Sequence, residues 1–561
     1  MKPMKIFSYA NEHPQEPLAV TDEGEKIRYG ELTDLAGQLG NLVGHRLVFA
    51  LCRNTPGSLL GYLGLLQSGG VPLLLDADIA PQLLKDLMET YHPAFCLFPE
   101  DLPAQTMDVI EKAAEGSTEK STLDTVSKGK AEAAGPNALL RQAYLDRRVK
   151  IRDYRLCRTA AEGEDPVLAP ELRLLLTTSG STGSSKLVRI SGDNLDANAE
   201  SIVEYLQITR DERPITVLPM QYSYGMSILH THVMVGAPII LTSYTLMERP
   251  FWERMRQEHV TSLCGVPYTF EMYNRLGLME MDLPDLHYIT QAGGKLPEKR
   301  HMQFARWCTE KGIRFYVMYG QTEASPRMGW LPPEKAIGKC GSMGIAIPGG
   351  TIDLIDENGE VIPEPMPASG GKADPEKGRT SGAAAGFSAS TTTGKSEAMS
   401  PVGELVYTGP NVALGYARCA VDLSKGDEFG GVLHTGDMAC RDTDRYLYIV
   451  GRRSRFIKMA GKRVGLDEVE KILRAAFPEL DLACAGKDDE LHVYVVPADV
   501  KPVEESPAGQ TEESETLTKW TERICACIQE MTGIPERRVC IFPLPEIPRN
   551  SSGKIRYAVL K

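Results

Sequence analysis

Short runs of consecutive apolar residues alternate along the chain with longer stretches in which apolar residues recur every three to four positions. The runs that we interpret as buried strands are RLVFALC, VPLLLD, AFCLFP, RLLLTTS, ITVLPM, APIILTS, HYITQAG and RFYVMYG. The stretches between them, among them 57–69, 193–206 and 296–312, are typical of helices with one apolar face. This alternation predicts an α/β protein of layered subdomains with largely parallel sheets, whose strands are apolar on both faces.

The pattern changes near residue 451. A basic run at 452–463 is followed by two helical patterns and three apolar strand patterns, all within 451–561. A segment of this size with its own apolar residues can form a separate core. We therefore expect a large N-terminal region at 1–450, with a β-rich part, and a small α+β domain at 451–561.

Three polar segments interrupt these patterns. Residues 113–137 and 499–516 are charged, and we interpret them as extended surface loops. Residues 364–400 are rich in Gly, Ser, Thr, Ala and Lys and cannot bury enough apolar surface to offset the entropy of ordering, which predicts disorder. Strand patterns flank 364–400, and Asn358-Gly359 marks a hairpin turn before it. The segment is therefore interpreted as a loop inserted into the β-rich part.

Composition excludes several classes of protein. Of 561 residues, 42% are hydrophobic and 24% are charged, which is ordinary for a globular chain. Lys and Arg number 62 and Asp and Glu number 75, so the formal net charge of −13 argues against a nucleic-acid-binding protein. The most apolar stretch, Leu59–Leu75, is interrupted by Gln67, Gly69 and Gly70 and is too short to span a bilayer.

The cysteines and the N-terminus point to a reducing compartment. Twelve cysteines are scattered from Cys52 to Cys540 without a CxxC pair, so we expect reduced thiols that pack as small hydrophobic side chains. His230 and His232 are two positions apart and point in different directions on a helix, which does not favour one shared metal. The N-terminus lacks the apolar core of a signal peptide. These features predict a cytoplasmic protein.

One segment has the composition of a phosphate-binding loop. A strand pattern ends at Leu176 in a run of hydroxyl-bearing residues and glycines that closes on Lys186. Small residues let the backbone approach phosphate oxygens, hydroxyl and N–H groups donate to them, and a lysine neutralises charge. No Ser or Thr follows Lys186, so the spacing differs from that of a Walker-type loop. The predicted phosphate-binding residues are Thr178, Ser179, Gly180, Ser181, Thr182, Gly183 and Lys186.

The run TTSGSTGSSK resembles the phosphate loop of the adenylate-forming superfamily, which includes acyl-CoA synthetases, peptide-synthetase adenylation domains and luciferases. The usual form is TSG(S/T)TGxPKG, and this chain has Ser185 for the proline and Leu187 for the glycine. The superfamily's other signatures follow in order: AGGKLP at 292–297, MYGQTEA at 318–324, GELVYTGPNVALGY at 403–416, HTGD at 434–437, GRRSRFIKMAGKRVGLDEVE at 451–470 and PRNSSGKI at 548–555. The chain is therefore identified as a member over essentially its whole length, apart from the polar insertions.

The resemblance implies an AMP-binding N-terminal domain with ATP and Mg²⁺ as cofactors. Tyr319 would stack on adenine while glycine backbone passes close to the ring. Thr322 would hydrogen-bond the α-phosphate, and Glu323 would supply a hard oxygen ligand for Mg²⁺ held mainly by the phosphates of ATP. The residues implied around adenine are Gly293, Gly294, Tyr319 and Gly320.

The C-terminal signatures imply ribose binding and catalysis. Asp437 would accept from the ribose hydroxyls, with Arg452 as a forked donor nearby. Lys554 would bridge the substrate carboxylate and the α-phosphate, where a positioned ammonium stabilises developing charge. The small domain would be mobile, presenting first Lys554 and then the loop around Gly461 for thiol attack. The residue at the pivot between the two domains, usually Asp or Lys, is Ser454 here. The alternative interpretation of the basic run 452–463 is a solvated surface. The implied catalytic residues are Thr322, Glu323 and Lys554.

The implied activity is that of an AMP-forming, acyl-CoA synthetase-like ligase. It would activate a carboxylic acid as an acyl-adenylate, release pyrophosphate, and transfer the acyl group to coenzyme A or to a separate phosphopantetheinyl carrier protein. Segment 217–233 resembles an acyl-pocket wall, in which Tyr222 replaces the usual His. Residues 221–226 contain no carboxylate to hold an α-ammonium, which favours an acid without a free α-amino group. Two alternatives stay open: amino-acid activation for a discrete carrier protein, and a nucleotide-binding regulator with reduced turnover.

Overall fold

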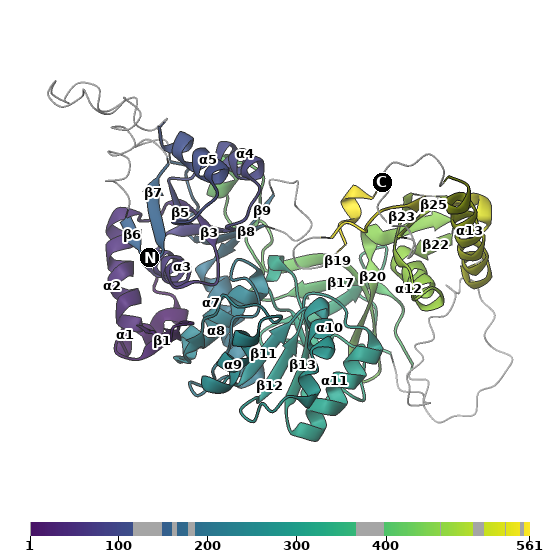
Figure 1. The fold of residues 1–561 in the computed structure, drawn as a ribbon, viewed down its shortest axis with the longest axis horizontal. Helices are drawn as coiled ribbons and strands as arrows, with labels where there is room; N and C mark the ends of the chain where they lie inside the picture. Colours follow the sequence, from purple (N-terminus) through teal and green to yellow (C-terminus); the bar gives the residue numbers. More distant parts are fainter. Residues whose placement is uncertain are drawn as a thin grey trace. The chain divides into compact units, whose positions relative to one another are not determined.

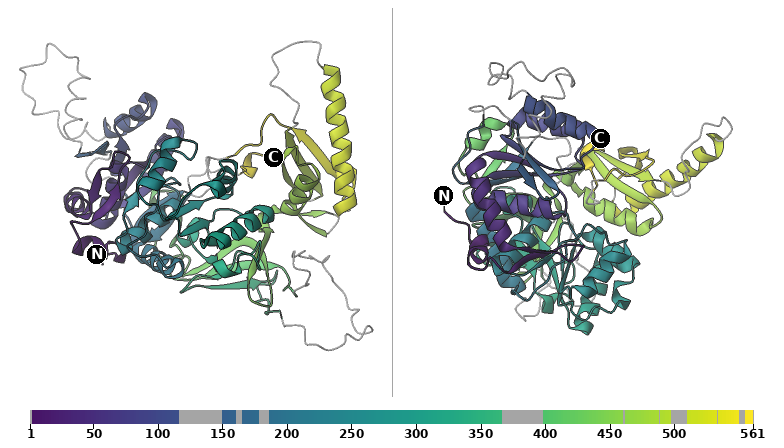
Figure 2. Two further views of the ribbon diagram at one scale, coloured as in Figure 1. Left: turned by 60° about the horizontal axis from the view of Figure 1, so that its bottom comes forward. Right: turned by 60° about the vertical axis from the view of Figure 1, so that its left-hand side comes forward.

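The computed structural model of the chain contains two compact units. It describes residues 2–115, 149–159, 165–177, 186–365, 398–459, 462–487, 489–496, 510–532, 534–549 and 555–560. The first unit comprises Met1–Thr351 and Tyr407–Leu433, and the second comprises Ile352–Val406 and His434–Lys561. Figures 1 and 2 show the elements of each unit, coloured along the chain. The predicted division at residue 450 stays a prediction; by their contacts, residues 434–450 group with the second unit.

The first unit is built around a mixed sheet in the order β18-β9-β8-β4-β3-β5-β7-β6 (Figure 1). Its centre, β8-β4-β3-β5, is parallel, and the strands outside the centre pair antiparallel. The bounds are β3 (Leu47–Cys52), β4 (Val71–Asp76), β5 (Phe95–Pro99), β6 (Val149–Ile151), β7 (Tyr154–Arg158), β8 (Leu172–Thr177), β9 (Leu187–Ser191) and β18 (Gly415–Ala417). The predicted parallel arrangement therefore holds for the central strands.

Both faces of this sheet are covered by side chains. Along β3, Val48 and Ala50 belong to one hydrophobic cluster, whereas Leu47 and Phe49 belong to another. Alternate residues of a strand point to opposite faces, so the two clusters lie on opposite sides of the sheet. A strand buried on both faces needs apolar residues at every position, which explains why the continuous apolar runs predicted these strands.

A second sheet of the first unit carries the elements that lead to the candidate site. Its order is β11-β12-β13-β14-β15, with the first three strands parallel. The carboxyl ends of β12 and β13 therefore meet at the same edge. The bounds are β11 (Ser262–Gly265), β12 (Tyr288–Gln291), β13 (Arg314–Tyr319), β14 (Gly329–Leu331) and β15 (Ile345–Ala346). A small third sheet contains β10 (Ile239–Ile240), β1 (Pro17–Val20) and β2 (Lys26–Arg28).

The predicted strand ITVLPM at 215–220 is wrong. Only Pro214 and Ile215 form isolated bridges, and the chain then turns at Met220 and Gln221 into a helix. A short buried apolar run can be a buried loop as well as a strand, and periodicity does not separate the two.

The helices of the first unit follow the predicted pattern. The predicted helix 193–206 begins with a capping box, in which the Ser191 hydroxyl accepts from the Asn194 N–H and Asn194 Oδ1 accepts from the Ser191 N–H. The bounds are α1 (Ser8–Glu12), α2 (Tyr29–Leu42), α3 (Pro56–Ser68), α4 (Pro81–Tyr91), α5 (Ala104–Glu115), α7 (Gly192–Leu206), α8 (Ser223–Val235), α9 (Arg249–Gln257), α10 (Pro267–Arg275), α11 (Glu298–Lys311) and the 3₁₀ helix η3 (Thr322–Ala324). Residues 113–115, predicted as loop, end α5.

The described residues of the second unit form three further sheets and two α-helices. The predicted hairpin forms: Ile355 and Val361 bridge across a turn in which Gly359 has φ of 83°. The bounds are β16 (Thr351–Ile355), β17 (Gly403–Thr408), β19 (Val432–Arg441), β20 (Leu447–Arg452), β21 (Phe456–Met459), β22 (Lys462–Gly465), β23 (Asp481–Lys487), β24 (Glu490–Val496), β25 (Val539–Pro543), α12 (Leu466–Ala476) and α13 (Gln510–Thr532). The sheet orders are β16-β17-β19-β20, β21-β22 and β23-β24-β25.

The C-terminal α+β segment has its own core. α12 and α13 pack on one face of β23-β24-β25 (Figure 2). Leu473, Leu491, Val493 and Ile524 belong to one hydrophobic cluster there. α13 also corrects a prediction, because 510–516 begin this helix rather than ending a loop. The polar residues of 510–516 continue a helix whose apolar face is supplied by later turns. The predicted insertion 364–400 and the rest of the predicted loops fall largely outside the described residues.

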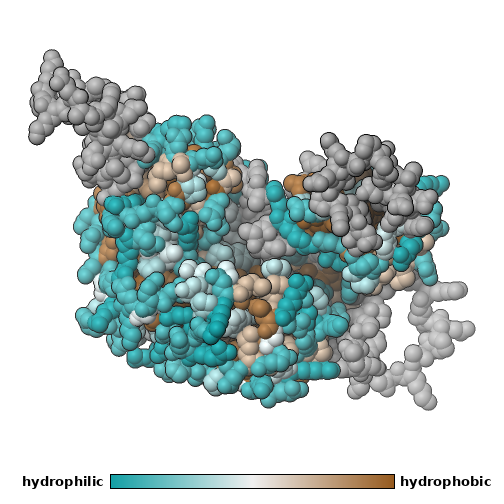
Figure 3. Space-filling view, in the orientation of Figure 1, coloured by the Kyte–Doolittle hydropathy of each residue, from teal (hydrophilic) through white to brown (hydrophobic). Residues whose placement is uncertain are grey.

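The predicted α/β class, with an α+β segment at the C-terminus, is confirmed. All twelve cysteines are free thiols, and most are buried, as the composition predicted. Among the described helices, none combines the length and the apolar character that a membrane span requires. Figure 3 shows that hydrophilic residues cover most of the described surface on the face drawn.

Candidate functional site

The loop after β13 is held in place by long-range hydrogen bonds. The Ala413 N–H donates to the Glu323 carbonyl at 2.9 Å. The buried Asn411 amide donates to the carbonyl oxygens of Ala324 and Arg327, at 2.6 and 2.7 Å. Residues from the segment before β18 thus fix the backbone of η3, which carries the predicted Thr322 and Glu323. A site built on such a braced loop keeps its side chains in one geometry.

Glu323 lies in a cluster with the predicted phosphate-loop lysine. The Tyr416 hydroxyl donates to Glu323 Oε1 at 2.8 Å, and Lys186 Nζ lies 3.3 Å from the centroid of the Tyr416 ring. Burial lowers the pKa of Lys186, and the negative charge of Glu323 opposes this effect. Glu323 Oε2 has no hydrogen-bond partner within the described parts of the chain. The cluster therefore offers a cation for phosphate and a hard oxygen for a divalent metal.

Thr322 lies against the start of α8. Its hydroxyl is 3.4 Å from the hydroxyl of Ser223, the first residue of that helix. A helix N-terminus carries unpaired N–H groups and a partial positive charge, which favour an anion. Two hydroxyls at this position can donate to phosphate or carboxylate oxygens. The role of Thr322 stays a prediction.

The predicted adenine-facing glycines follow β12, next to the end of β13 that carries Tyr319. Gly293 has φ of 82°, and a Cβ added there would lie 2.7 Å from the Tyr222 hydroxyl. A Cβ on Gly294 would lie 3.1 Å from Pro267 Cγ. Backbone that approaches its neighbours this closely needs glycine. Burial raises the pKa of Tyr222, so the side chain that replaces the usual His is a neutral phenol beside this turn.

Replacement of Gly320 by alanine is expected to destabilise the first unit by about 3 kcal/mol or more. A Cβ on Gly320 would lie 1.7 Å from the Pro326 carbonyl oxygen, and a backbone atom cannot rotate away. Urea unfolding measures the loss. Gly338→Ala is the matched control, because nothing lies within 4 Å of its Cβ position. Equal midpoints for the two variants would contradict the tight contact.

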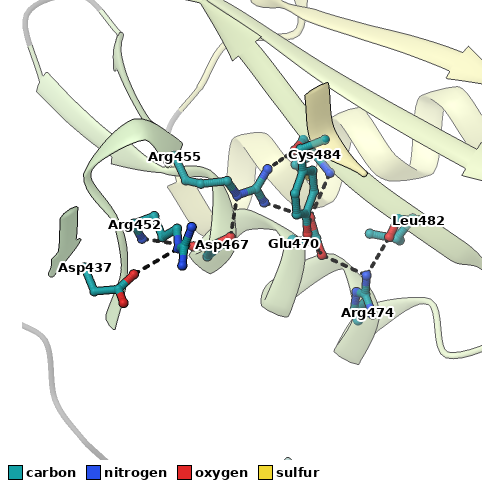
Figure 4. Close-up of polar contacts among 9 residues, drawn as sticks. Asp437, Arg452, Arg455, Asp467, Glu470, Arg474, Leu482 and Cys484 are labelled. Atoms are coloured by element: carbon teal, nitrogen blue, oxygen red, sulfur yellow. Dashed lines mark hydrogen bonds and ion pairs between the residues drawn. The ribbon is translucent and has the colours of Figure 1, made fainter. Parts of the chain in front are cut away.

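Asp437 and Arg452 lie together in the second unit (Figure 4). They are cross-strand partners on β19 and β20, and Arg452 Nε lies 3.0 Å from Asp437 Oδ1. The Asp437 side chain is 6% exposed and that of Arg452 is 61% exposed. The predicted acceptor and its forked donor are therefore adjacent, with the guanidinium open to solvent.

The basic run that begins at Arg452 is only partly a solvated face. Arg455 is buried and donates to Asp467 and Glu470 at 2.6 and 3.0 Å (Figure 4). Its guanidinium also stacks on the Tyr557 ring. It also donates to a carbonyl of β23, and Arg474 shares Glu470. The interpretation as a solvated face is wrong for Arg455, whose network joins the start of α12 to the last sheet.

Several predicted residues lie outside the described parts of the chain. These are Thr178, Ser179, Gly180, Ser181, Thr182, Gly183, Gly461 and Lys554. Other residues at the site were not predicted from the sequence: Tyr416, Ser223, Asn411 and Arg327. Tyr416 belongs to a recognised motif, but its contact with Glu323 spans 93 positions along the chain. Contacts at such separation leave no local signal in the sequence.

The arrangement of these residues fits an adenylate-forming enzyme, and the comparisons with known proteins show the family. The family model described as AMP-binding enzyme matches residues 6–372. The chain belongs to this family.

Curated relatives are named as CoA ligases. The chain is 27% identical over 395 residues to an indoleacetate–CoA ligase of Aromatoleum aromaticum, covering 70% of this chain and 67% of the relative. It is 26% identical over 387 residues to a 2-succinylbenzoate–CoA ligase of Bacillus cytotoxicus, covering 69% of each. It is 26% identical over 393 residues to an oxalate–CoA ligase of Arabidopsis thaliana, covering 69% of this chain and 66% of the relative. The alignments span about two thirds of these relatives.

Solved structures share the fold over the whole chain. O-succinylbenzoate coenzyme A synthetase from Bacillus subtilis, in complex with AMP, matches with a TM-score of 0.67 and 20% identity, covering 100% of this chain and 98% of that one. ATP-bound MatB from Rhodopseudomonas palustris matches with a TM-score of 0.64 and 20% identity, at the same coverage. The prediction of an AMP-forming, acyl-CoA synthetase-like ligase is confirmed at the level of the family.

Proposed function

We propose that this protein activates a carboxylic acid without a free α-amino group as an acyl-adenylate and transfers the acyl group to coenzyme A. The observation that carries the proposal is the cluster of Lys186, Tyr416 and Glu323, which brings the end of the phosphate loop to the braced loop after β13. A lysine, a carboxylate and a pair of hydroxyls, held by backbone contacts, suit a nucleotide triphosphate with a divalent ion.

The described residues fit ATP and Mg²⁺. Lys186 would neutralise phosphate charge, and Thr322 with Ser223 would donate to the α-phosphate at the start of α8. Glu323 would give its Oε2 to magnesium, which when bound neutralises charge on the phosphates. Tyr319 and the glycine turn after β12 would hold adenine. Among the solved structures of this fold, one is in complex with ATP and magnesium, with a TM-score of 0.65 and 21% identity.

The proposed reaction has two steps. In the first, a carboxylate oxygen attacks the α-phosphorus, the bond to the β-phosphate oxygen breaks, and pyrophosphate leaves. In the second, a thiolate attacks the acyl carbon and AMP leaves. Lys554 would stabilise charge in the first step, while Asp437 and Arg452 would hold the ribose. These roles rest on the resemblance of their motifs and are proposals.

Coenzyme A is the acceptor that the relatives favour, because each is named as a CoA ligase. A discrete carrier protein is the second candidate. The acids in those names are an indole acid, a substituted benzoate and oxalate, so the relatives differ widely in substrate size. The absence of a carboxylate at 221–226 supports an acid without an α-ammonium group. Cytoplasmic location stays a prediction from the sequence.

ATP–pyrophosphate exchange tests the proposal. We would measure it with a panel of aliphatic acids, aryl acids, diacids and amino acids, and follow thioester formation with coenzyme A. Exchange with a non-amino acid and acyl-CoA as product is the expected result. Exchange with one amino acid only would favour carrier-protein activation. Binding of ATP without exchange for any acid would favour the regulatory alternative.

A further inference from the structure

Arg327 is a buried arginine beside the candidate site. It follows η3 and is only 3% exposed. Its backbone carbonyl is held by Asn411, so the residue has a fixed position at the end of the braced loop. A guanidinium carries its positive charge at all ordinary pH values, and a buried charge without an opposite charge costs several kcal/mol.

The contacts of the Arg327 guanidinium are all neutral. Nη2 donates to the Ser227 hydroxyl at 3.4 Å, and the guanidinium carbon lies 4.2 Å from the centroid of the Tyr224 ring. Nε has no hydrogen-bond partner among the residues that the structure describes. Burial raises the pKa of the nearby Tyr205 to about 12, against the effect of the Arg327 charge, so this phenol is neutral at pH 7. No described carboxylate forms an ion pair with Arg327.

Arg327 differs in this respect from the other buried arginines that the structure describes. Arg189, Arg254, Arg441 and Arg455 each pair with a carboxylate, and Arg173 donates to two main-chain carbonyl oxygens. The other buried guanidinium groups are thus stabilised by carboxylates or carbonyl oxygens. Arg327 has an N–H donor, Nε, without such a partner among the described residues.

The guanidinium lines a cavity between α7, α8 and strands β11–β13. The other polar side chains with hydroxyl or ring nitrogen groups around it are Tyr224, Ser227, Thr231, His232, Ser262, Tyr288 and Thr290. None of the lining residues is acidic. Burial lowers the pKa of His232 to about 4, and its Nδ1 lies 2.8 Å from the Ile228 carbonyl oxygen, so His232 is neutral at pH 7. Among the described lining residues, Arg327 is therefore the one that carries a charge at pH 7.

The cavity adjoins the loop at which the acid would be activated. Met318 and Arg327 both line it, and they flank Tyr319, Thr322 and Glu323 in the chain. Its volume of about 20 Å³ has room for about one water-sized group. An acid whose reacting carboxylate lies at Thr322 would extend its far end toward this cavity, where one oxygen fits and a long alkyl chain does not.

We propose that Arg327 binds a second acidic group of the substrate, so that the acid activated here is a short diacid or an acid with another anionic group. The inference rests on the proposed function. A carboxylate oxygen that enters the cavity can accept a charge-assisted hydrogen bond from Arg327 Nε, which has no partner among the described residues. The same charge disfavours an apolar chain end, because an uncharged group would leave the guanidinium without a partner.

Matched pairs of acids test this inference by ATP–pyrophosphate exchange. We would compare kcat/KM for glutarate with pentanoate, and for terephthalate with 4-methylbenzoate. In each pair one member carries the second carboxylate and the other carries a methyl group in its place. The wild-type enzyme is expected to favour the diacid at least about tenfold in one pair. Arg327→Met should lower the ratio of diacid to monoacid about 100-fold, and Arg327→Lys should recover part of it.

Arg300→Met is the matched control. This arginine of α11 lies outside the cavity lining and 2.7 Å from Glu271, so its removal should leave the ratio within about twofold of the wild type. Arg327→Gln, which keeps an amide donor without the charge, replaces Arg327→Met if the latter does not fold. A wild-type preference for the monoacids, or an equal loss for both members in Arg327→Met, would overturn the inference. Exchange with no acid would instead contradict the proposed function itself.

Discussion

Lys554→Ala is expected to form acyl-adenylate about 10³-fold more slowly than the wild-type enzyme while binding ATP with nearly the same affinity. The proposed ammonium stabilises charge that builds only as the carboxylate attacks phosphorus, so its loss acts on the transition state and little on bound ATP. Pyrophosphate exchange measures the first step, and equilibrium binding of ATP in the absence of acid measures the affinity.

Lys487→Ala serves as the control for Lys554→Ala. Lys487 is another lysine of the second unit; its side chain is 71% exposed and lies 3.0 Å from Glu490 in a surface ion pair. Its replacement removes the same charge from the same unit and should leave exchange within about twofold, since surface pairs contribute little. Unchanged exchange in Lys554→Ala would mean that another group performs this role. A parallel loss of ATP affinity would assign Lys554 to ground-state binding instead.

Elements with one dominant physical cause could be predicted from the sequence. β3 is buried at every position and β4 at every position but its last, and their continuous apolar runs predicted both strands. The hairpin turn at Asn358-Gly359 was recognisable because such turns need positive φ, which favours an Asn-Gly pair. Gly359 has positive φ in the structure. The failures have a cause as well. The segment ITVLPM is a buried loop, because it packs against other elements without pairing along a neighbouring strand. Residues 510–516 are helical although their composition is typical of a loop.

The candidate site could be predicted residue by residue but not as an arrangement. Thr322, Glu323 and Lys186 each lie in a local motif, which the sequence displays directly. The Tyr416 hydroxyl on Glu323 depends on folding that brings distant segments together. Arg327 carries no motif, and only its burial among neutral groups marks it. Sequence patterns therefore identified the chemistry shared by the family, whereas the feature that bears on substrate choice required the structure.

Glu323→Gln is expected to lower exchange about 10²-fold and to raise the magnesium concentration needed for half-maximal exchange. The amide keeps the size of the side chain, and its oxygen can still accept from the Tyr416 hydroxyl, so the loop keeps its geometry. The substitution removes the negative charge that a hard divalent ion prefers. Exchange measured across a magnesium titration separates the two effects, because a weaker metal site is partly restored at high magnesium.

Tyr416→Phe separates the metal-ligand role from a purely structural one. It retains the ring beneath Lys186 and removes only the hydroxyl that donates to Glu323 at 2.8 Å. Loss of one such hydrogen bond should lower exchange about fivefold, with a smaller shift in the magnesium titration than Glu323→Gln shows. If Glu323→Gln and Tyr416→Phe lost the same activity at every magnesium concentration, Glu323 would act by holding the loop rather than by binding metal. If high magnesium partly restored the activity of Glu323→Gln and had little effect on Tyr416→Phe, Glu323 would act by binding the metal.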